Sequence, residues 1–327
     1  MLVVNPNICV DHTIAMEELM PGHVQRPRSG AVSLGGKGVN VARVARSLDD
    51  RATIVSFLPQ GDEDQLMALA RLEGADLRGP RVEGNARGAT IILEDSGRVT
   101  VLNEPGVVVS ERDWDDLLGE VRSLSPQHRT IVCSGSLPPG SPSDSYARVV
   151  RTAHDLDMRC VVDSAGEILR AAAEAGADAV SPNLAEAESL LFGSRPEGVD
   201  PSGPDVAERA ARCVQGLAAL GARHVIVSAG SNGAAFDLEG QVAWCTAPRV
   251  NVLNPIGAGD SLIGGLVHAL ERGDSWPAAV RFALCTASAS CEQVRAGGIE
   301  PQRIAELMST LDDVTVLADF FVTGRAS

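Results

Sequence analysis

The sequence predicts an α/β protein built on a largely parallel β-sheet with helices on both faces. Short runs rich in β-branched residues alternate with helical patterns along most of the chain, an order typical of parallel strands joined by helices. Hydrophobic residues make up 44% of the 327 residues, which is enough to fill a large core. Because no apolar run reaches the ~18 residues of a membrane-spanning helix, we expect no membrane partner.

The alternation of strands and helices runs almost the whole length of the chain. We expect strands at residues 2–8, 52–58, 129–133, 158–163, 178–181 and 223–228. We expect helices near residues 37–48, 63–73, 143–155, 165–175, 184–192 and 205–220, then closing helices at 257–272, 276–292 and 300–311. In sheets of this kind ligands bind beyond the carboxyl ends of the strands. The segments that follow the strands are therefore the expected place for a site.

Two segments depart from this alternation. Residues 11–34 show little helical periodicity, and residues 88–102 have a hairpin pattern that turns at Asp95-Ser96-Gly97. We expect these segments to pair into a small sheet that projects from the core as a lid. Residues 193–204 are rich in Gly and Pro and are predicted to form a loop. Residues 312–327 carry no informative pattern.

The chain is acidic and poor in aromatic residues. Its formal net charge of −15 argues against a nucleic-acid partner, because a phosphate backbone demands clustered Lys and Arg. An aromatic content of 3% argues against a platform for stacking bases. A local positive pocket for one small phosphorylated ligand is compatible with this composition.

The seven cysteines predict buried thiols rather than disulfide bonds. Their number is odd, no CxxC motif occurs, and most lie within apolar runs; a disulfide framework or a zinc site is the less favoured alternative. Met1-Leu2-Val3-Val4 lacks the basic region and the cleavage site of a signal peptide and is predicted to form a strand. We therefore expect a cytoplasmic protein.

The most informative motif is Asn254-Pro255-Ile256-Gly257-Ala258-Gly259-Asp260-Ser261. It opens an amphipathic helical pattern, and its glycines let backbone N–H groups point at one spot, where the helix dipole favours an anion. Asp260, in the first turn, is placed to accept a proton from a hydroxyl beside that anion, as phosphoryl transfer to an alcohol requires. The alternative is that the glycines pack the helix tightly and Asp260 only caps it.

A second glycine-rich motif, Gly35-Gly36-Lys37-Gly38-Val39-Asn40-Val41-Ala42-Arg43, also opens a helix. Glycines allow a ligand to approach the backbone closely, and Asn40 lies one turn into the helix, where its amide is suited to bind a polyol. The motif matches neither the phosphate loop GxxxxGK[ST] nor GxGxxG. A plain turn between a strand and a helix explains it equally well.

Three weaker motifs also follow predicted strands. Asn183 and Glu186 lie one turn apart, where they either hold Mg²⁺ through its waters or simply cap the helix. The glycines of Ser228-Ala229-Gly230-Ser231-Asn232-Gly233 suit a nucleotide phosphate or ribose, and a simple turn explains them equally well. Ser134-Gly135-Ser136-Leu137-Pro138-Pro139-Gly140 supplies hydroxyls at a strand end.

In order and spacing, these motifs resemble the ribokinase-like PfkB carbohydrate kinases. The motifs at 35–43 and 254–261 resemble the two hallmarks of that family, and the resemblance runs from about residue 1 to about residue 295. Asn103-Glu104-Pro105-Gly106, together with residues 134–140, is most similar to the branch containing 1-phosphofructokinase and tagatose-6-phosphate kinase. The resemblance implies a three-layer αβα sandwich with a β lid, ATP and Mg²⁺ as cofactors, and a homodimer formed through the lid.

The resemblance also implies a division of the chain. The kinase core comprises residues 1–10, 35–84 and 107–327, and the lid comprises residues 11–34 and 85–106. The resemblance assigns the catalytic base to Asp260 and the anion hole to the amides of Gly257, Ala258 and Gly259.

The remaining roles implied by the resemblance concern binding. Contacts to the sugar hydroxyls match Asp11, Gly35, Gly36 and Asn40. Residues that hold the phosphate already on the substrate match Arg87 and Ser136, with Arg26 and Lys37 as weaker candidates. The ATP-binding part matches Asn183, Glu186, Ser228, Gly230, Gly233 and Asn254, with Glu186 holding Mg²⁺ indirectly through water.

The sequence departs from the family pattern at several positions. Pro255 replaces the usual Thr of the late motif, and Ser181 replaces a Lys before the Pro-Asn of the metal element. Ala86-Arg87-Gly88-Ala89 replaces the usual TRxN, and His23 stands where some phosphofructokinases carry Lys. These departures bear on the identity of the sugar more than on the reaction.

We therefore predict transfer of the γ-phosphate of ATP to a primary hydroxyl of a ketohexose phosphate, of the 1-phosphofructokinase or tagatose-6-phosphate kinase type. Kinase activity on an unphosphorylated sugar or a nucleoside is the alternative within the same class. A non-catalytic sugar- or nucleotide-binding regulator on the same fold is an alternative of another class. The intact residues 257–260 argue against the regulator, because ligand binding alone needs no base.

Overall fold

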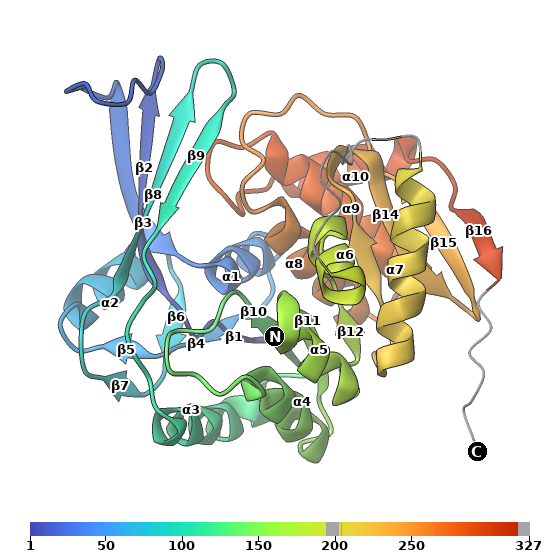
Figure 1. Cartoon of the computed structure of the whole chain (residues 1–327), viewed down its shortest axis with the longest axis horizontal. Coiled ribbons are helices and arrows are strands. Elements are labelled where there is room, and N and C mark those ends of the chain that lie inside the picture. The colour runs from blue at the N-terminus through green and yellow to red at the C-terminus, as the bar shows by residue number, and fades with distance from the viewer. Residues whose placement is uncertain (194–202, 204, 320–327) are drawn as a thin grey trace.

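The computed structural model shows a three-layer body from which a smaller sheet projects (Figure 1). It describes residues 1–193, 203 and 205–319. Most of the predicted loop at 193–204 lies outside these residues. Within the described part of the chain, no helix is long and apolar enough to cross a membrane.

The central sheet has six parallel strands in the order β12-β11-β10-β1-β4-β6. They are β1 (Leu2–Val4), β4 (Thr53–Val55), β6 (Asp76–Arg78), β10 (Thr130–Ser134), β11 (Arg159–Asp163) and β12 (Ala179–Val180). Because the strands are parallel, their carboxyl ends meet at one edge of the sheet. The predicted parallel sheet is confirmed.

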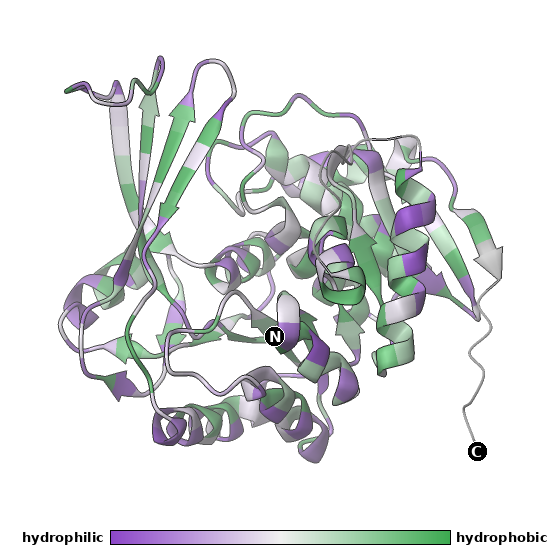
Figure 2. Cartoon of the chain, viewed as in Figure 1, coloured by the Kyte–Doolittle hydropathy of each residue, from purple (hydrophilic) through white to green (hydrophobic). Residues whose placement is uncertain are grey.

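In the described residues, ten α-helices pack around this sheet and the strands that continue it. They are α1 (Lys37–Ser47), α2 (Glu63–Leu72), α3 (Glu111–Leu124), α4 (Ser145–Asp155), α5 (Gly166–Glu174), α6 (Leu184–Phe192), α7 (Val206–Leu220), α8 (Ala258–Glu271), α9 (Trp276–Cys291) and α10 (Pro301–Thr310). Figure 2 shows hydrophilic residues on the outward faces of α3 and α7. Each predicted helix is present within two residues of its expected ends.

Alternation along the strands divides the core into two halves. Leu2 and Val4 of β1 are buried among residues of α3 to α7, whereas Val3 is buried among residues of α1, α2, α8 and α9. Successive side chains of a strand point to opposite faces, so each half of the core lies on one face of the sheet. This arrangement is the expected αβα sandwich.

The strand expected at 223–228 is present, and it also pairs with an antiparallel strand that was not predicted. It is β13 (Ile226–Ser228), the edge of an antiparallel sheet with β14 (Gly233–Leu238), β15 (Gln241–Thr246) and β16 (Thr315–Asp319). Isolated parallel bridges from Val180 to Val225 and from Asn183 to Ser228 join it to β12. The turn at 230–232 sends the chain back as a hairpin, so no helix crosses over to a further parallel strand.

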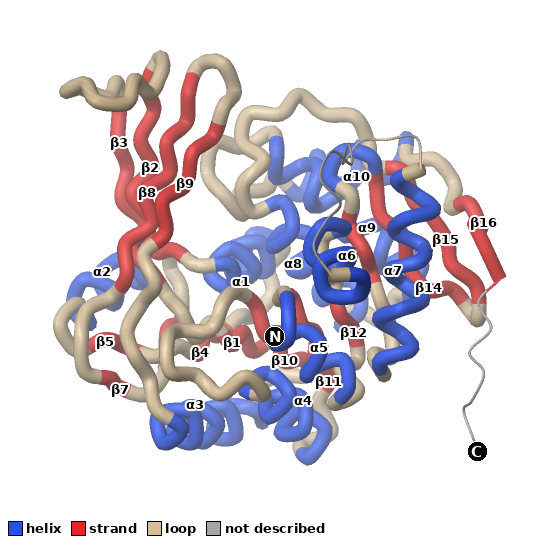
Figure 3. The backbone as a smooth tube through the Cα atoms, viewed as in Figure 1, coloured by secondary structure: helices blue, strands red, loops and turns tan. Residues whose placement is uncertain are grey.

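A four-stranded sheet in the order β3-β2-β8-β9 stands out from the body (Figures 1 and 3). Its strands are β2 (Cys9–Met16), β3 (Ser29–Gly35), β8 (Arg87–Glu94) and β9 (Val99–Asn103). β8 and β9 pair antiparallel, as the predicted hairpin at 88–102 requires, and β2 pairs parallel to β8. We call these four strands the projecting sheet.

Several elements escaped prediction. The sequence did not predict helix α3 or the strands β6, β14, β15 and β16. It also did not predict the short parallel pair β5 (Leu58–Pro59) and β7 (Arg81–Val82). α3 begins with a capping box between Ser110 and Asp113 and buries one apolar face that includes Trp114.

The cysteine prediction is confirmed, since all seven thiols are free and six are buried.

Candidate active site

A cavity of about 880 Å³ is lined by the base of the projecting sheet and by the carboxyl ends of the central strands. Most of the predicted site residues meet here. They are Asp11, Gly36, Lys37, Asn40, Arg87, Ser136, Asn183, Glu186, Ser228, Gly230, Gly257, Ala258, Gly259 and Asp260. This is the edge where ligands bind in parallel α/β sheets, and we refer to it as the central cavity.

The N-terminus of α8 forms one wall of the central cavity. Gly257 is the N-cap in the left-handed conformation, with φ 81°, which favours glycine over any residue with a side chain. The N–H groups of a first helical turn lack partners within the helix, and the dipole makes that end positive. Because neither Gly257 nor Gly259 has a side chain, an anion is able to approach these groups closely.

Asp260 lies in the first turn of α8, and only 5% of its surface is exposed. The Asn40 Nδ2 donates a 2.7 Å hydrogen bond to Asp260 Oδ2. Burial, together with the nearby Asp163, raises the pKa of Asp260 to about 7, although Lys37, Asn40 and Arg43 act in the opposite direction. A carboxylate with such a pKa is suited to accept a proton near neutral pH.

Lys37 and Asp163 form an ion pair of 3.3 Å on the floor of the central cavity. Pairing with Asp163 raises the pKa of Lys37, so its amine stays protonated at neutral pH. Asp163 was not predicted as a site residue. The available signal was weak: a single carboxylate at the carboxyl end of a predicted strand.

The predicted sugar-contact residues lie where β2 and β3 leave the body. A side chain on Gly35 would place its Cβ 2.0 Å from Asp11 Oδ1, and Gly36 has φ 124° beside Asn5. Gly35 does not line the central cavity itself, but its lack of a side chain leaves room for Asp11. The Cys9 thiol donates to Asp11 Oδ1 at 3.1 Å, and burial raises the pKa of Asp11.

Arg87 and Ser136 are linked through one residue. Arg87 Nε donates to the Asn7 carbonyl at 3.0 Å, and Asn7 Nδ2 donates to Ser136 Oγ at 3.2 Å. The Tyr146 hydroxyl donates to the Gly135 carbonyl at 3.0 Å and so supports the loop that carries Ser136. The structure therefore brings an arginine and a hydroxyl together at one end of the central cavity.

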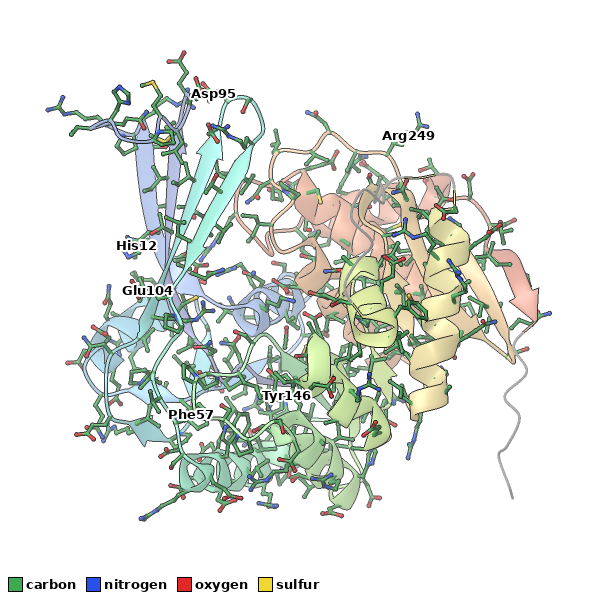
Figure 4. The ribbon with its side chains drawn as sticks, in the orientation of Figure 1. His12, Phe57, Asp95, Glu104, Tyr146 and Arg249 are labelled. Atoms are coloured by element: carbon green, nitrogen blue, oxygen red, sulfur yellow. The ribbon has the colours of Figure 1, made fainter. Side chains whose placement is uncertain are left out.

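Glu104 and Arg26 lie at opposite ends of the projecting sheet. Glu104 Oε2 accepts a 2.6 Å hydrogen bond from Gly88 N at the base of this sheet (Figure 4), and Glu104 lines the central cavity. Arg26 lies instead in the loop between β2 and β3, beside a separate hollow that contains Met16 and Met20. The structure does not bring Arg26 to the central cavity.

The predicted nucleotide residues lie at the opposite end. Asn183 Oδ1 accepts from Glu186 N, and Glu186 Oε2 accepts from Asn183 N, both at 2.9 Å. The capping alternative is therefore present, and both residues still line the central cavity. Ser228 and Gly230 line it too, and they also border an adjoining pocket of about 260 Å³.

Two residues of the predicted ATP-binding set lie behind the cavity walls. A Cβ on Gly233 would lie 2.2 Å from the Cys245 carbonyl oxygen, so β15 requires a glycine there. Asn254 Nδ2 donates to the Val294 carbonyl at 2.8 Å, and its Oδ1 accepts from Ile256 N at 3.0 Å. Asn254 thus shapes the loop that leads into α8.

The donor set for a metal ion is sparse. In residues 1–193, 203 and 205–319, no group of three or more His, Cys, Asp or Glu side chains is placed to hold a metal ion. One oxygen of Glu186 is engaged in the capping box. These residues fit a Mg²⁺ ion held mainly by water and by the phosphates of a nucleotide, as is usual for this ion.

Comparison with known proteins points to one family. Residues 4–303 match the family described as pfkB family carbohydrate kinase. A 1-phosphofructokinase from Escherichia coli is 29% identical over 296 residues, which cover 90% of this chain and 92% of the relative. A 1-phosphofructokinase from Haloferax volcanii is 31% identical over 319 residues, which cover 96% of both chains.

A solved structure gives the same result for the fold. Phosphofructokinase-2 from Escherichia coli, crystallised in complex with potassium, superposes with a TM-score of 0.81 at 25% identity. The match covers 95% of this chain and 98% of that structure. The similarity therefore includes both the body and the projecting sheet.

Proposed function

This chain belongs to the pfkB family of carbohydrate kinases, and we propose that it transfers the γ-phosphate of ATP to a primary hydroxyl of a ketohexose phosphate. The proposed reaction is of the 1-phosphofructokinase or tagatose-6-phosphate kinase type. The observation that carries this proposal is the placement of Asp260 and Arg87 along the walls of one cavity. Asp260 offers a base, and Arg87 offers a cation for a phosphate that the sugar already bears.

The reaction begins with the sugar hydroxyl beside Asp260. This carboxylate accepts the proton as the hydroxyl oxygen forms its bond to the γ-phosphorus and the bond to ADP breaks. The N-terminal amides of α8 and the ammonium of Lys37 stabilise the negative charge of the transferred group. Ser228 and Gly230 would hold ATP, and Glu186 would hold Mg²⁺ through water, where the ion would supply further positive charge to the phosphates.

The sugar end of the cavity favours a phosphorylated substrate. In the part of the chain that the structure describes, the Arg87 guanidinium makes no ion pair, and its Nε donates only to a backbone carbonyl. A guanidinium without an ion-pair partner in a cavity is suited to bind a phosphate through charge-assisted hydrogen bonds. Ser136 adds a hydroxyl close to it.

We also propose a lid role for the projecting sheet, which its position supports. Asp11 and Arg87 line the central cavity from this sheet, so its movement would open or close the sugar end. Closure excludes water, which otherwise competes with the sugar for the γ-phosphate.

The same sheet is the proposed interface of a homodimer. On the face that carries Leu102, it exposes apolar side chains, namely Val32 at 49% and Leu102 at 60%. Exposed apolar side chains on a sheet favour association. Light scattering during size-exclusion chromatography tests the proposal: a monomeric mass, or a dimer that survives Leu102→Glu, would count against this interface.

A substrate panel tests the proposed function. ATP consumption is measured with fructose 1-phosphate, fructose 6-phosphate and tagatose 6-phosphate, and with fructose, ribose and adenosine as unphosphorylated counterparts. We expect the highest kcat/KM with one of the sugar phosphates. A clear preference for an unphosphorylated compound would overturn the proposed substrate class and favour the alternative, a kinase of a bare sugar or a nucleoside.

A further inference from the structure

A pair of oppositely charged residues is buried behind the wall of the central cavity, and neither one lines it. Glu73 follows the last turn of α2, and Arg43 lies on the buried side of α1. Their side chains are only 6% and 9% exposed, and Arg43 Nη2 lies 2.9 Å from Glu73 Oε2. Burying two charges is costly unless their other hydrogen-bonding groups also find partners. The other hydrogen-bond partners of Arg43 and Glu73 therefore indicate which parts of the site this pair holds in place.

Arg43 reaches the candidate base through one intermediate residue. Arg43 Nη1 donates a 2.5 Å hydrogen bond to Asn40 Oδ1, and Asn40 Nδ2 donates in turn to Asp260 Oδ2 at 2.7 Å. Guanidinium groups only donate, so the amide oxygen of Asn40 must face Arg43 and its NH₂ group must face Asp260. Arg43 therefore sets the orientation of the amide that contacts Asp260.

The same guanidinium also holds the loop behind the anion hole. Arg43 Nη1 donates to the Ala296 carbonyl at 2.6 Å. Ala296 packs against the N-cap of α8, where a Cβ added to Gly257 would lie 3.1 Å from the Ala296 Cβ. A change at Arg43 therefore affects both the partner of Asp260 and the support for Gly257.

Glu73 joins this network to the projecting sheet. Its Oε1 accepts a 3.0 Å hydrogen bond from Leu34 N, near the end of β3, and forms an ion pair with Arg295. Arg43 Nη2 donates to the carbonyl of the same Leu34 at 3.1 Å. One buried pair thus fixes the end of β3, the helix that carries Asn40, and the loop that contains Ala296.

We propose that Arg43 and Glu73 are positioning residues for the phosphoryl transfer, holding Asp260 and the N-terminus of α8 in register with the base of the projecting sheet. The proposal goes beyond the proposed function but rests on its assignment of Asp260 as the base. Neither residue touches the substrate. Misplacing reacting groups by about 1 Å is enough to cost about 10²-fold in rate, so a remote pair of this kind is able to control turnover.

Three variants separate orientation from charge. Arg43→Met removes both the hydrogen bonds and the positive charge, Arg43→Lys keeps the charge without the forked donors, and Glu73→Gln disturbs the pair while Arg43 stays in place. Arg148→Met, on α4, is the control, because Arg148 forms an ion pair with Asp115 away from the cavity. The readouts are kcat, the KM for ATP, the pH profile of kcat and the melting temperature, with whichever sugar wild type phosphorylates.

The variants should differ in a defined way. We expect Arg43→Met and Glu73→Gln to lower kcat by about 10²-fold with little change in the KM for ATP, while Arg148→Met leaves kcat unchanged. The charged groups that face Asp260 are Asp163 from β11 and Lys37 and Arg43 from α1. Because Arg43 favours the ionised carboxylate, Arg43→Met should move the acid limb of the profile to higher pH, and Arg43→Lys should leave it in place.

Opposite results would overturn the proposal. If the variants have only lower melting temperatures, with the kcat and acid limb of wild type, the pair is a structural element alone. If Arg43→Met does not fold, Arg43→Lys and Glu73→Gln still test the positioning role. A wild-type kcat in both of these variants would contradict it.

An NMR titration keeps this proposal separate from the proposed function. The Asp260 carboxyl carbon is followed in protein labelled at aspartate and assigned with Asp260→Asn. A midpoint that rises in Arg43→Met supports the link between Arg43 and Asp260 without any substrate. If the titration midpoint of Asp260 moves but kcat does not change, Asp260 is not the base.

Discussion

Asn40 donates a 2.7 Å hydrogen bond to Asp260, although 220 residues separate them in the chain. The contact joins the first turns of α1 and α8, each of which opens with a glycine-rich segment beside the central cavity. Asn40 has only one NH₂ group, and that group contacts the candidate base. A sugar hydroxyl bound by Asn40 would therefore lie within reach of the carboxylate that is to deprotonate it.

Asp260→Asn should nearly abolish turnover and leave ATP binding within a few-fold. Asparagine keeps the shape of the side chain and loses the proton acceptor, and loss of a general base costs about 10²–10⁴-fold in rate. Steady-state kinetics and calorimetric ATP binding measure the two effects. A variant with a kcat near that of wild type would show that Asp260 is not the base.

The rate should fall as the pH drops below about 7. Burial and Asp163 raise the pKa of Asp260 from its ordinary value of 3.8 to about 7, so the carboxylate becomes protonated, and inactive as a base, on the acid side. Between these two values the folded chain holds a proton that the unfolded chain has lost, so this group's contribution to stability declines as pH rises. Asp260→Asn removes that effect and should be more stable than wild type at pH 8. An acid limb near the ordinary pKa, together with an unchanged melting temperature at pH 8, would contradict a raised pKa at Asp260.

Most of the helical part of the fold, α3 excepted, was predictable because helices are determined by local patterns. The helix expected at 184–192 is α6, Leu184–Phe192, and the one expected at 37–48 is α1, Lys37–Ser47. Strand pairing depends on partners that are distant in the sequence, which explains why the antiparallel strands that follow β13 were not predicted. The apolar run of β13 predicted a strand, but only the hairpin that follows makes the sheet antiparallel there.

The site was predictable to a similar degree. The motifs around Asn40 and Asp260 identified the two helix starts in the cavity wall, because glycines at helix starts are visible in a sequence. Asp163 and Glu73 were missed. Each is a single carboxylate with no surrounding pattern, and only tertiary packing brings Asp163 to Lys37 and Glu73 to Arg43.

Alanine at the two glycines of the proposed anion hole should have different consequences for stability. Gly257 has φ 81°, and an added Cβ would lie 3.1 Å from the Ala296 Cβ, so Gly257→Ala should destabilise the fold by at least the ~1–2 kcal/mol cost of the left-handed conformation. An added Cβ at Gly259 meets nothing within 4 Å. Gly259→Ala should therefore keep the melting temperature and lower kcat, because the methyl group would occupy space at the cavity wall that Gly259 lines. Denaturant unfolding and kinetics distinguish these outcomes; equal stability of the two variants would contradict the separate roles of Gly257 and Gly259.

The projecting sheet should become protected when both ligands bind. Asp11 and Arg87 reach the central cavity from it, so closure over a sugar orders the strands that carry them. Hydrogen exchange in residues 11–34 and 88–102 should slow with sugar and a non-hydrolysable ATP analogue together, more than with either alone. Unchanged exchange in both segments would remove the lid role.

Arg87→Ala should identify the substrate class. Its guanidinium lines the central cavity, held by a 3.0 Å hydrogen bond from Nε to the Asn7 carbonyl, with its remaining donors available for a phosphate. Losing hydrogen bonds to a charged group costs ~1.5–3 kcal/mol. The free energy of the transition state with the preferred sugar phosphate should rise by that amount, and kcat/KM should fall accordingly.

The same variant should leave the KM for ATP and the use of a bare sugar nearly unchanged, because neither involves the sugar phosphate. Arg28→Ala is the matched control, since Arg28 pairs with Asp95 on the exposed part of the projecting sheet. Equal losses with phosphorylated and unphosphorylated sugars would indicate that Arg87 only supports the fold of the cavity. No loss with either would show that the phosphate, if the substrate has one, is bound elsewhere.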